Sequence, residues 1–221
     1  MKQFSRLIIL LLLQFCNQNS YAQQAAPFYQ EIQAFKKQDS INPPVKGAIL
    51  FVGSSSFRGW TNVQEYFPEH IIINRGFGGS SLPHVIQYAS DIIFPYQPRQ
   101  VLIYCGENDF TSAGVTAEIV YERFMELFGL IRNKLPKTQI DFVSLKPSPS
   151  RIKYISEMIR ANGMIRGFIK KQSRSAYIDV YSKMLLPDGS VMPDIFKSDK
   201  LHMNEKGYAI WQKAIKPYLK K

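Results

Sequence analysis

Short apolar runs alternate along this chain with stretches in which apolar residues recur at helical spacing, and no other feature of the sequence limits the fold as strongly. The apolar runs occupy residues 48–52, 71–73, 101–104, 140–145 and 176–180. Helical spacing is found over residues 27–38, 81–93, 117–135, 151–171 and 208–219. Buried strands that alternate with amphipathic helices favour a parallel sheet covered on both faces. We therefore predict a single α/β domain, a three-layer doubly wound sandwich with a mainly parallel five-stranded sheet.

The first 22 residues have the pattern of a secretory signal peptide. Lys2 and Arg6 precede an apolar run over residues 7–13, and Ser20-Tyr21-Ala22 places small residues at the −3 and −1 positions of a cleavage site. A run of this length is shorter than the about 20 residues that a membrane span needs. We therefore favour export over a membrane anchor and expect a periplasmic or secreted protein, cleaved near Ala22.

The remaining chain divides into an N-terminal helical extension over residues 23–46 and a domain over residues 47–221. We expect no integral membrane segment after the signal peptide is removed. Lipid attachment at Cys16 is a less favoured alternative, because Phe15 stands where a small residue normally precedes a lipidated cysteine. The oligomeric state is not predicted.

The chain is basic, with 28 Lys and Arg against 17 Asp and Glu. Cleavage removes Lys2 and Arg6 and lowers the formal net charge from +11 to +9. Such a surplus fits a nucleic acid, an acidic polymer or a solvated surface. We favour the solvated surface and expect no nucleic-acid partner, because no basic run exceeds two residues and no nucleic-acid motif accompanies them.

Cys105 is the one cysteine that remains after cleavage, so the mature chain cannot form an internal disulfide. Its stability must come from packing, and we expect Cys105 to be a small buried residue. Residues 76–81 lack the final glycine of a dinucleotide fingerprint, and no phosphate-loop lysine or zinc-protease histidine pattern is present. Residues 53–57 are not a lipase elbow, because Phe57 stands where the second glycine belongs. We predict no cofactor and no metal.

Residues that acyl transfer requires follow four separate strands or loops. Ser55 follows the first predicted strand, where its hydroxyl can face a cleft and its amide a developing oxyanion. Gly79 follows the second strand and can offer a backbone N–H, and Asn108 follows the third and can offer a side-chain amide. Asp199 and His202 are three residues apart, a spacing that can bring the carboxylate to one ring nitrogen while the other faces the serine. The set indicates a serine hydrolase.

Each of these residues also has a structural interpretation. A serine at a strand-to-helix turn often caps the helix, a glycine fits a tight turn, and Asn108 and Asp109 fit turn formers. The structural alternative for His202 is a histidine exposed on the surface. We favour the catalytic roles for the set because its members occur together, and a structural role for Asp109.

The set resembles the SGNH (GDSL-type) hydrolase family, whose four sequence blocks contribute Ser, Gly, Asn and His in that order. The resemblance implies that Ser55 is the nucleophile and that His202 is the general base and then the general acid. It implies that Asp199 orients His202. It further implies an oxyanion hole formed by the amides of Ser55 and Gly79 and the side chain of Asn108.

The resemblance covers about residues 47–218 and implies the flavodoxin-like SGNH hydrolase fold. The first block departs from the family pattern at Ser54, where the family has an aspartate before the nucleophile. That aspartate is not the catalytic acid, and similar sequences carry Gly-Ser-Ser in this place. The departure leaves open which serine attacks, and we expect Ser55.

The resemblance also implies an ester substrate, a small molecule or a carbohydrate, and we favour a serine esterase that removes a small acyl group such as acetyl. A lysophospholipase or thioesterase is an alternative. It predicts an apolar rim around Ser55, which the flanking rings of Phe57, Trp60, Phe77 and Phe110 leave open. A noncatalytic protein that binds a glycan or another ligand on the same fold is a second alternative.

Three cations stand close to the predicted site in the sequence. Arg75 lies beside the glycine block, and Lys146 and Arg151 follow the fourth strand. Arg75 and Lys146 are candidate substrate contacts that would meet an anionic group, and Arg151 is a third. The alternative, in which they pair with local carboxylates or carbonyls, is slightly favoured.

Overall fold

The computed structural model describes residues 26–221, and its centre is one five-stranded sheet. The strands are β1 (Ile49–Gly53), β2 (Ile72–Gly76), β3 (Gln100–Tyr104), β4 (Gln139–Val143) and β5 (Ser175–Ile178). They lie in the order β2-β1-β3-β4-β5, and all four neighbouring pairs are parallel. The predicted α/β domain with five strands is confirmed, with a sheet that is parallel throughout rather than mainly. The predicted signal peptide and Cys16 lie outside the described residues.

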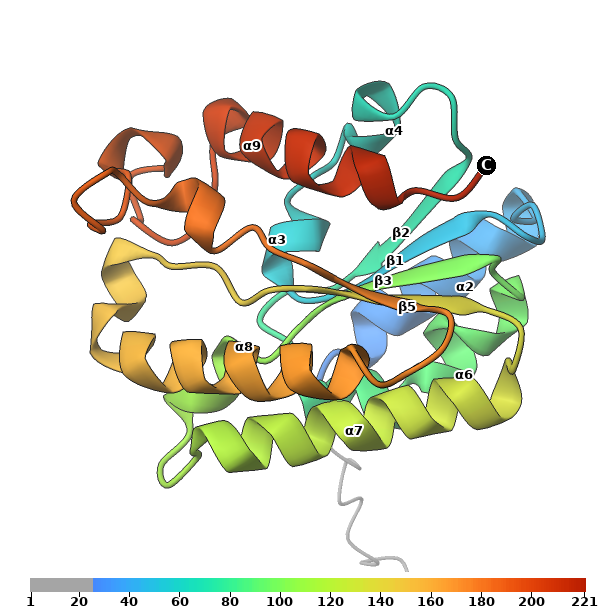
Figure 1. Cartoon of the computed structure of the whole chain (residues 1–221). Coiled ribbons are helices and arrows are strands. Elements are labelled where there is room, and N and C mark those ends of the chain that lie inside the picture. Colours follow the sequence, from blue (N-terminus) through green and yellow to red (C-terminus); the bar gives the residue numbers. More distant parts are fainter. Residues whose placement is uncertain (1–25) are drawn as a thin grey trace, which may run out of the picture.

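Helices cover both faces of the sheet and make the three layers (Figure 1). One face carries α2 (Tyr29–Ile41), α5 (Leu82–Gln87), α6 (Ala89–Ile92), α7 (Ala117–Lys134) and α8 (Ile155–Ile169). The other face carries α3 (Ser55–Arg58), α4 (Val63–Tyr66) and α9 (Glu205–Ile215). Short 3-10 helices lie in the connections: η1 (Phe94–Tyr96), η2 (Asn108–Thr111), η3 (Pro149–Tyr154), η4 (Ser182–Met184), η5 (Pro193–Ile195) and η6 (Lys216–Tyr218).

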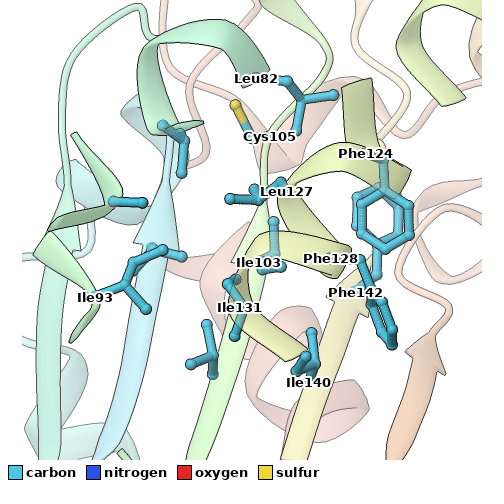
Figure 2. Packing of buried hydrophobic residues seen from close by; sticks show 14 of the residues in the cluster. Leu82, Ile93, Ile103, Cys105, Phe124, Leu127, Phe128, Ile131, Ile140 and Phe142 are labelled. Atoms are coloured by element: carbon cyan, nitrogen blue, oxygen red, sulfur yellow. The ribbon is translucent and has the colours of Figure 1, made fainter. Parts of the chain in front are cut away.

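Alternate side chains of the strands build two hydrophobic cores, one on each face of the sheet. Leu50 of β1 packs in the core under α7, whereas the next residue, Phe51, packs in the core under α9. Figure 2 shows the first core, where Leu127 of α7 lies with Ile103 of β3. Cys105 is fully buried there, as predicted, and burial raises the pKa of its thiol well above the usual range.

Several elements begin or divide differently from the prediction. The helix expected over residues 81–93 is two short helices that meet at Tyr88. The helix expected over residues 151–171 starts as the 3-10 turn η3, because the backbone of Arg151 leaves the helical region with φ of −113°. The last helix starts at Glu205 because the side chain of Asn204 accepts backbone N–H groups of its first turn. Helices α3 and α4 have four residues each, too few to produce a periodic pattern.

The N-terminal helix α2 is part of the domain core. Ile32 is 1% exposed and packs in the core beneath α7. Within residues 26–221, none of the helices combines the length and the apolar character of a membrane span.

Candidate active site

Three neighbouring strands end at the same edge of the sheet. The register pairs Gly53 at the end of β1 with Gly76 at the end of β2 and with Tyr104 at the end of β3. Ligands bind at the carboxyl ends of the strands in sheets of this type. The segments that carry Ser55, Gly79 and Asn108 leave the sheet here.

Ser55 is the first residue of α3. The preceding Gly53 has φ of +136°, and a Cβ there would lie 1.9 Å from a carbonyl oxygen of β3, so only glycine allows this tight exit from the strand. Ser55 Oγ lies 2.9 Å from Nε2 of His202. Ser54 and Ser56 are buried, and Ser55 is the one of these three adjacent serines whose hydroxyl contacts the imidazole.

His202 and Asp199 lie in the loop between β5 and α9. Asp199 Oδ2 is 2.6 Å from Nδ1 of His202, and Asp199 Oδ1 accepts the backbone N–H groups of Leu201 and His202 at 2.9 Å each. Burial opposes ionisation of Asp199, but these hydrogen bonds outweigh it and lower the pKa of the carboxyl to about 2. The carboxylate favours the proton on Nδ1, which leaves Nε2 free to accept the proton of Ser55.

Unengaged N–H groups are available at the ends of β1, β2 and β3. Gly79 has φ of +70°, with no atom within 4 Å of the place that a Cβ would take, so its conformation rather than its space favours glycine. Asn108 Nδ2 donates to the Ser80 carbonyl at 3.0 Å, which leaves its second amide proton free. Within residues 26–221, the backbone N–H groups of Ser55 and Gly79 have no hydrogen-bond acceptor. Such free donors are what an oxyanion requires.

Asp109 holds the neighbouring elements together. Its Oδ2 accepts the N–H of Leu82 at 3.0 Å, and its Oδ1 pairs with Arg123 at 2.8 Å. Burial raises the pKa of this carboxyl, and the hydrogen bonds from Leu82 and Arg123 oppose the rise. These contacts agree with the structural role predicted for Asp109.

Arg75 and Lys146, the two candidate substrate contacts of the sequence, both lie in the interior. Arg75 is nearly buried, where its guanidinium pairs with Asp39 and donates to the Tyr96 hydroxyl at 2.7 Å. Lys146 is 1% exposed, and its Nζ lies 2.9 Å from a carboxylate oxygen of Glu107. Both cations are held by internal carboxylates, the alternative that the sequence slightly favoured.

The third cation, Arg151, does reach the site. Its guanidinium donates to Oδ1 of Asn108 at 3.4 Å.

Glu31 of α2 also reaches the site and was missed in the sequence. Its carboxylate lies 2.7 Å from Nε of Arg58, at the end of α3, and 3.4 Å from the backbone N–H of Gly78, beside Gly79. An acidic residue on an N-terminal helix, outside the four blocks, carries no sequence signal for such a position.

The four aromatic rings that flank the motifs are in the interior. Phe57, Trp60, Phe77 and Phe110 are each 2% exposed or less. They fill the two cores and do not form an apolar rim around Ser55. Within the described part of the chain, no group of three or more His, Cys, Asp and Glu side chains is placed to hold a metal ion.

Several solved structures share this fold. A GDSL-like lipase from Bacteroides thetaiotaomicron is similar with a TM-score of 0.73 and 18% identity, over 85% of this chain and 96% of that one. A carbohydrate esterase family 3 member from Talaromyces cellulolyticus is similar with a TM-score of 0.63 and 15% identity, over 79% and 95% of the two chains. An acetyl-xylooligosaccharide esterase from Geobacillus stearmophilus is similar with a TM-score of 0.61 and 14% identity, over 77% and 93%.

No curated protein matches the chain. The sequence model of the GDSL-like lipase/acylhydrolase family matches residues 47–210, which include all four blocks and span most of the chain. The chain therefore belongs to the GDSL-like lipase/acylhydrolase family.

Proposed function

We propose that this protein is a serine esterase that hydrolyses short acyl esters, in the first place acetyl groups on a carbohydrate or a similar small molecule. The observation that carries the proposal is the continuous hydrogen-bonded chain from Ser55 Oγ through His202 to Asp199, with distances of 2.9 and 2.6 Å. A serine whose hydroxyl faces a carboxylate-oriented imidazole is equipped for nucleophilic acyl transfer.

In the proposed mechanism, Ser55 Oγ attacks the ester carbonyl carbon while its proton passes to Nε2 of His202. The Asp199 carboxylate stabilises the imidazolium that forms. The carbonyl oxygen becomes an oxyanion that accepts hydrogen bonds from the amides of Ser55 and Gly79 and from Nδ2 of Asn108. Collapse of this intermediate moves the proton from His202 to the departing alcohol and leaves an acyl-serine. Water, deprotonated by His202, then releases the carboxylic acid and restores Ser55.

The burial of the aromatic rings supports a short acyl group over a lipid. An enzyme that acts on long acyl chains needs exposed apolar surface near the nucleophile. The rings of Phe57, Trp60, Phe77 and Phe110 do not supply it, because they are buried. Similarity to an acetyl-xylooligosaccharide esterase and to a carbohydrate esterase adds support for an acetyl group on a carbohydrate.

The test is release of p-nitrophenol from its acetyl and octanoyl esters by the purified protein. We expect turnover of the acetyl ester, with a higher kcat/KM than for the octanoyl ester. We expect Ser55→Ala to lower kcat by at least about 1000-fold. The matched control is Ser54→Ala, which removes the neighbouring hydroxyl that does not contact His202 and should retain most of the activity.

Other results would select other functions. A clear preference for the octanoyl ester would favour a lysophospholipase-type enzyme over the proposed esterase. Turnover by the native protein no faster than by Ser55→Ala, with both proteins folded, would favour a noncatalytic binding protein.

A further inference from the structure

Two carboxylates beside the candidate site pair with permanent cations, Glu107 with Lys146 and Asp109 with Arg123, and Asp199 contacts the His202 imidazole. Within residues 26–221, Arg151 has no carboxylate partner, and its guanidinium contacts only Oδ1 of Asn108, at 3.4 Å. The Arg151 guanidinium is therefore a cation beside the site that no carboxylate of the described residues contacts.

Arg151 lies between the loop that carries His202 and the loop that carries Asn108. The N–H of the preceding Ser150 donates to the carbonyl of Lys200 at 3.1 Å, two residues before His202. The guanidinium extends instead to Asn108, the oxyanion residue at the end of β3. This residue thus spans from the histidine loop to the asparagine loop.

The guanidinium of Arg151 does not make all the hydrogen bonds that it can make. The Nε atom of Arg151 is buried and has no hydrogen-bond partner. An unmade hydrogen bond of this kind costs stability, and an unsatisfied buried group in a native structure needs an explanation, of which a functional role is one. A guanidinium presents five N–H donors in a planar fork that matches the two oxygens of a carboxylate.

We propose that Arg151 binds a carboxylate carried by the substrate beside the scissile ester. The inference rests on the proposed esterase function and narrows its substrate class to acyl esters of acidic molecules, such as a carbohydrate that contains a uronic acid. One arginine matches the single charge of a carboxylate, whereas a phosphate monoester carries nearly two.

The test compares p-nitrophenyl acetate with two anionic esters, its ring-carboxylated analogue and p-nitrophenyl succinate, which place the charge on the alcohol side and on the acyl side. The measured quantity is the ratio of kcat/KM for each anionic ester to kcat/KM for the neutral one. We expect Arg151→Gln to lower this ratio by about 10- to 100-fold for at least one anionic ester, the size of a hydrogen bond to a charged group.

The matched control is Lys153→Gln, which removes a nearby positive charge whose Nζ lies over the Tyr154 ring at 4.8 Å. It should leave the ratio at the value of the unmodified protein. A ratio that is unchanged in Arg151→Gln overturns the inference, whether both rates fall together or neither falls. In the first case Arg151 acts only by positioning Asn108.

A binding measurement separates this inference from the proposed function. Turnover no faster than that of Ser55→Ala would remove the esterase proposal. Calorimetric binding of the ring-carboxylated ester to Ser55→Ala, with and without Arg151→Gln, tests the anionic site without catalysis. An affinity at least about 10-fold weaker in the double variant supports the site, and equal affinities overturn it.

Discussion

Replacement of Lys146 by methionine tests how the buried charges behind the site are held. Lys146 is 1% exposed, and its Nζ lies 2.9 and 3.1 Å from the two carboxylate oxygens of Glu107, which is 4% exposed. Glu107 also accepts the Tyr104 hydroxyl, and burial, with the charge of Glu107, raises the pKa of that phenol well above its usual range. The phenol therefore stays protonated and remains a donor when the lysine is replaced.

The expected cost of Lys146→Met is about 3–5 kcal/mol of unfolding free energy, because it leaves the Glu107 carboxylate buried with no opposite charge. For a domain of this size, a loss of that magnitude corresponds to a Tm lower by roughly 6–20 °C. Urea denaturation at neutral pH measures the loss of unfolding free energy, and thermal unfolding measures the change in Tm.

Two further variants serve as controls for the cost of the unpaired charge. The double variant Lys146→Met/Glu107→Gln has no buried charge and should recover most of the loss, since an amide oxygen still accepts the Tyr104 hydroxyl. Lys36→Met removes an ion pair of similar length, 3.1 Å, whose side chains are 53% and 30% exposed, and should cost less than about 1 kcal/mol. A loss below about 1 kcal/mol for Lys146→Met, or a double variant less stable than either single one, would refute the reasoning.

Three other predictions concern the site itself. Asp199→Asn should lower kcat by up to about 10,000-fold, because the amide no longer fixes the proton on Nδ1 of His202. The pKa of Asp199 is lowered to about 2 from 3.8, so its contribution to stability is complete above about pH 4 and is lost as the pH falls through 2. The acid denaturation curves of the variant and the parent should therefore converge near pH 2. Gly79→Ala should destabilise the fold by about 1–2 kcal/mol through its φ of +70° and lower kcat by up to about 100-fold, measured by thermal unfolding and ester kinetics. Glu31→Gln should lower kcat more than it raises KM, because the carboxylate contacts both Arg58 and the loop before Gly79, and an unchanged kcat would contradict this.

The sequence predicted the contacts that are local and the fold that brings the others together. Asp199 and His202 are three residues apart, so their pairing follows from a single turn of chain. The contact between Ser55 and His202 spans 147 residues, and it became predictable only because both follow elements of one parallel sheet. The resemblance to a known family supplied the order of the blocks.

The position of Arg75 does not follow from its closeness in sequence to the glycine block. The apolar run that marks β2 ends at residue 73, but the strand itself continues through Arg75 to Gly76. Within a strand, adjacent side chains point to opposite faces. Asn74 therefore points to α3 and donates to the Phe57 carbonyl, while Arg75 points to the face that carries α2 and pairs with Asp39. Hydropathy alone does not reveal polar residues that extend a strand.

Helix α2 lies before the residues that match the family model, and yet it contributes to both the core and the site. Ile32 packs in the core, Asp39 neutralises the nearly buried Arg75, and Glu31 joins Arg58 to the N–H of Gly78. Without this helix, Arg75 would keep a buried charge unpaired, and the last turn of α3 would lose its link to the loop before Gly79. The structural unit around Ser55 therefore starts at α2 and not at β1.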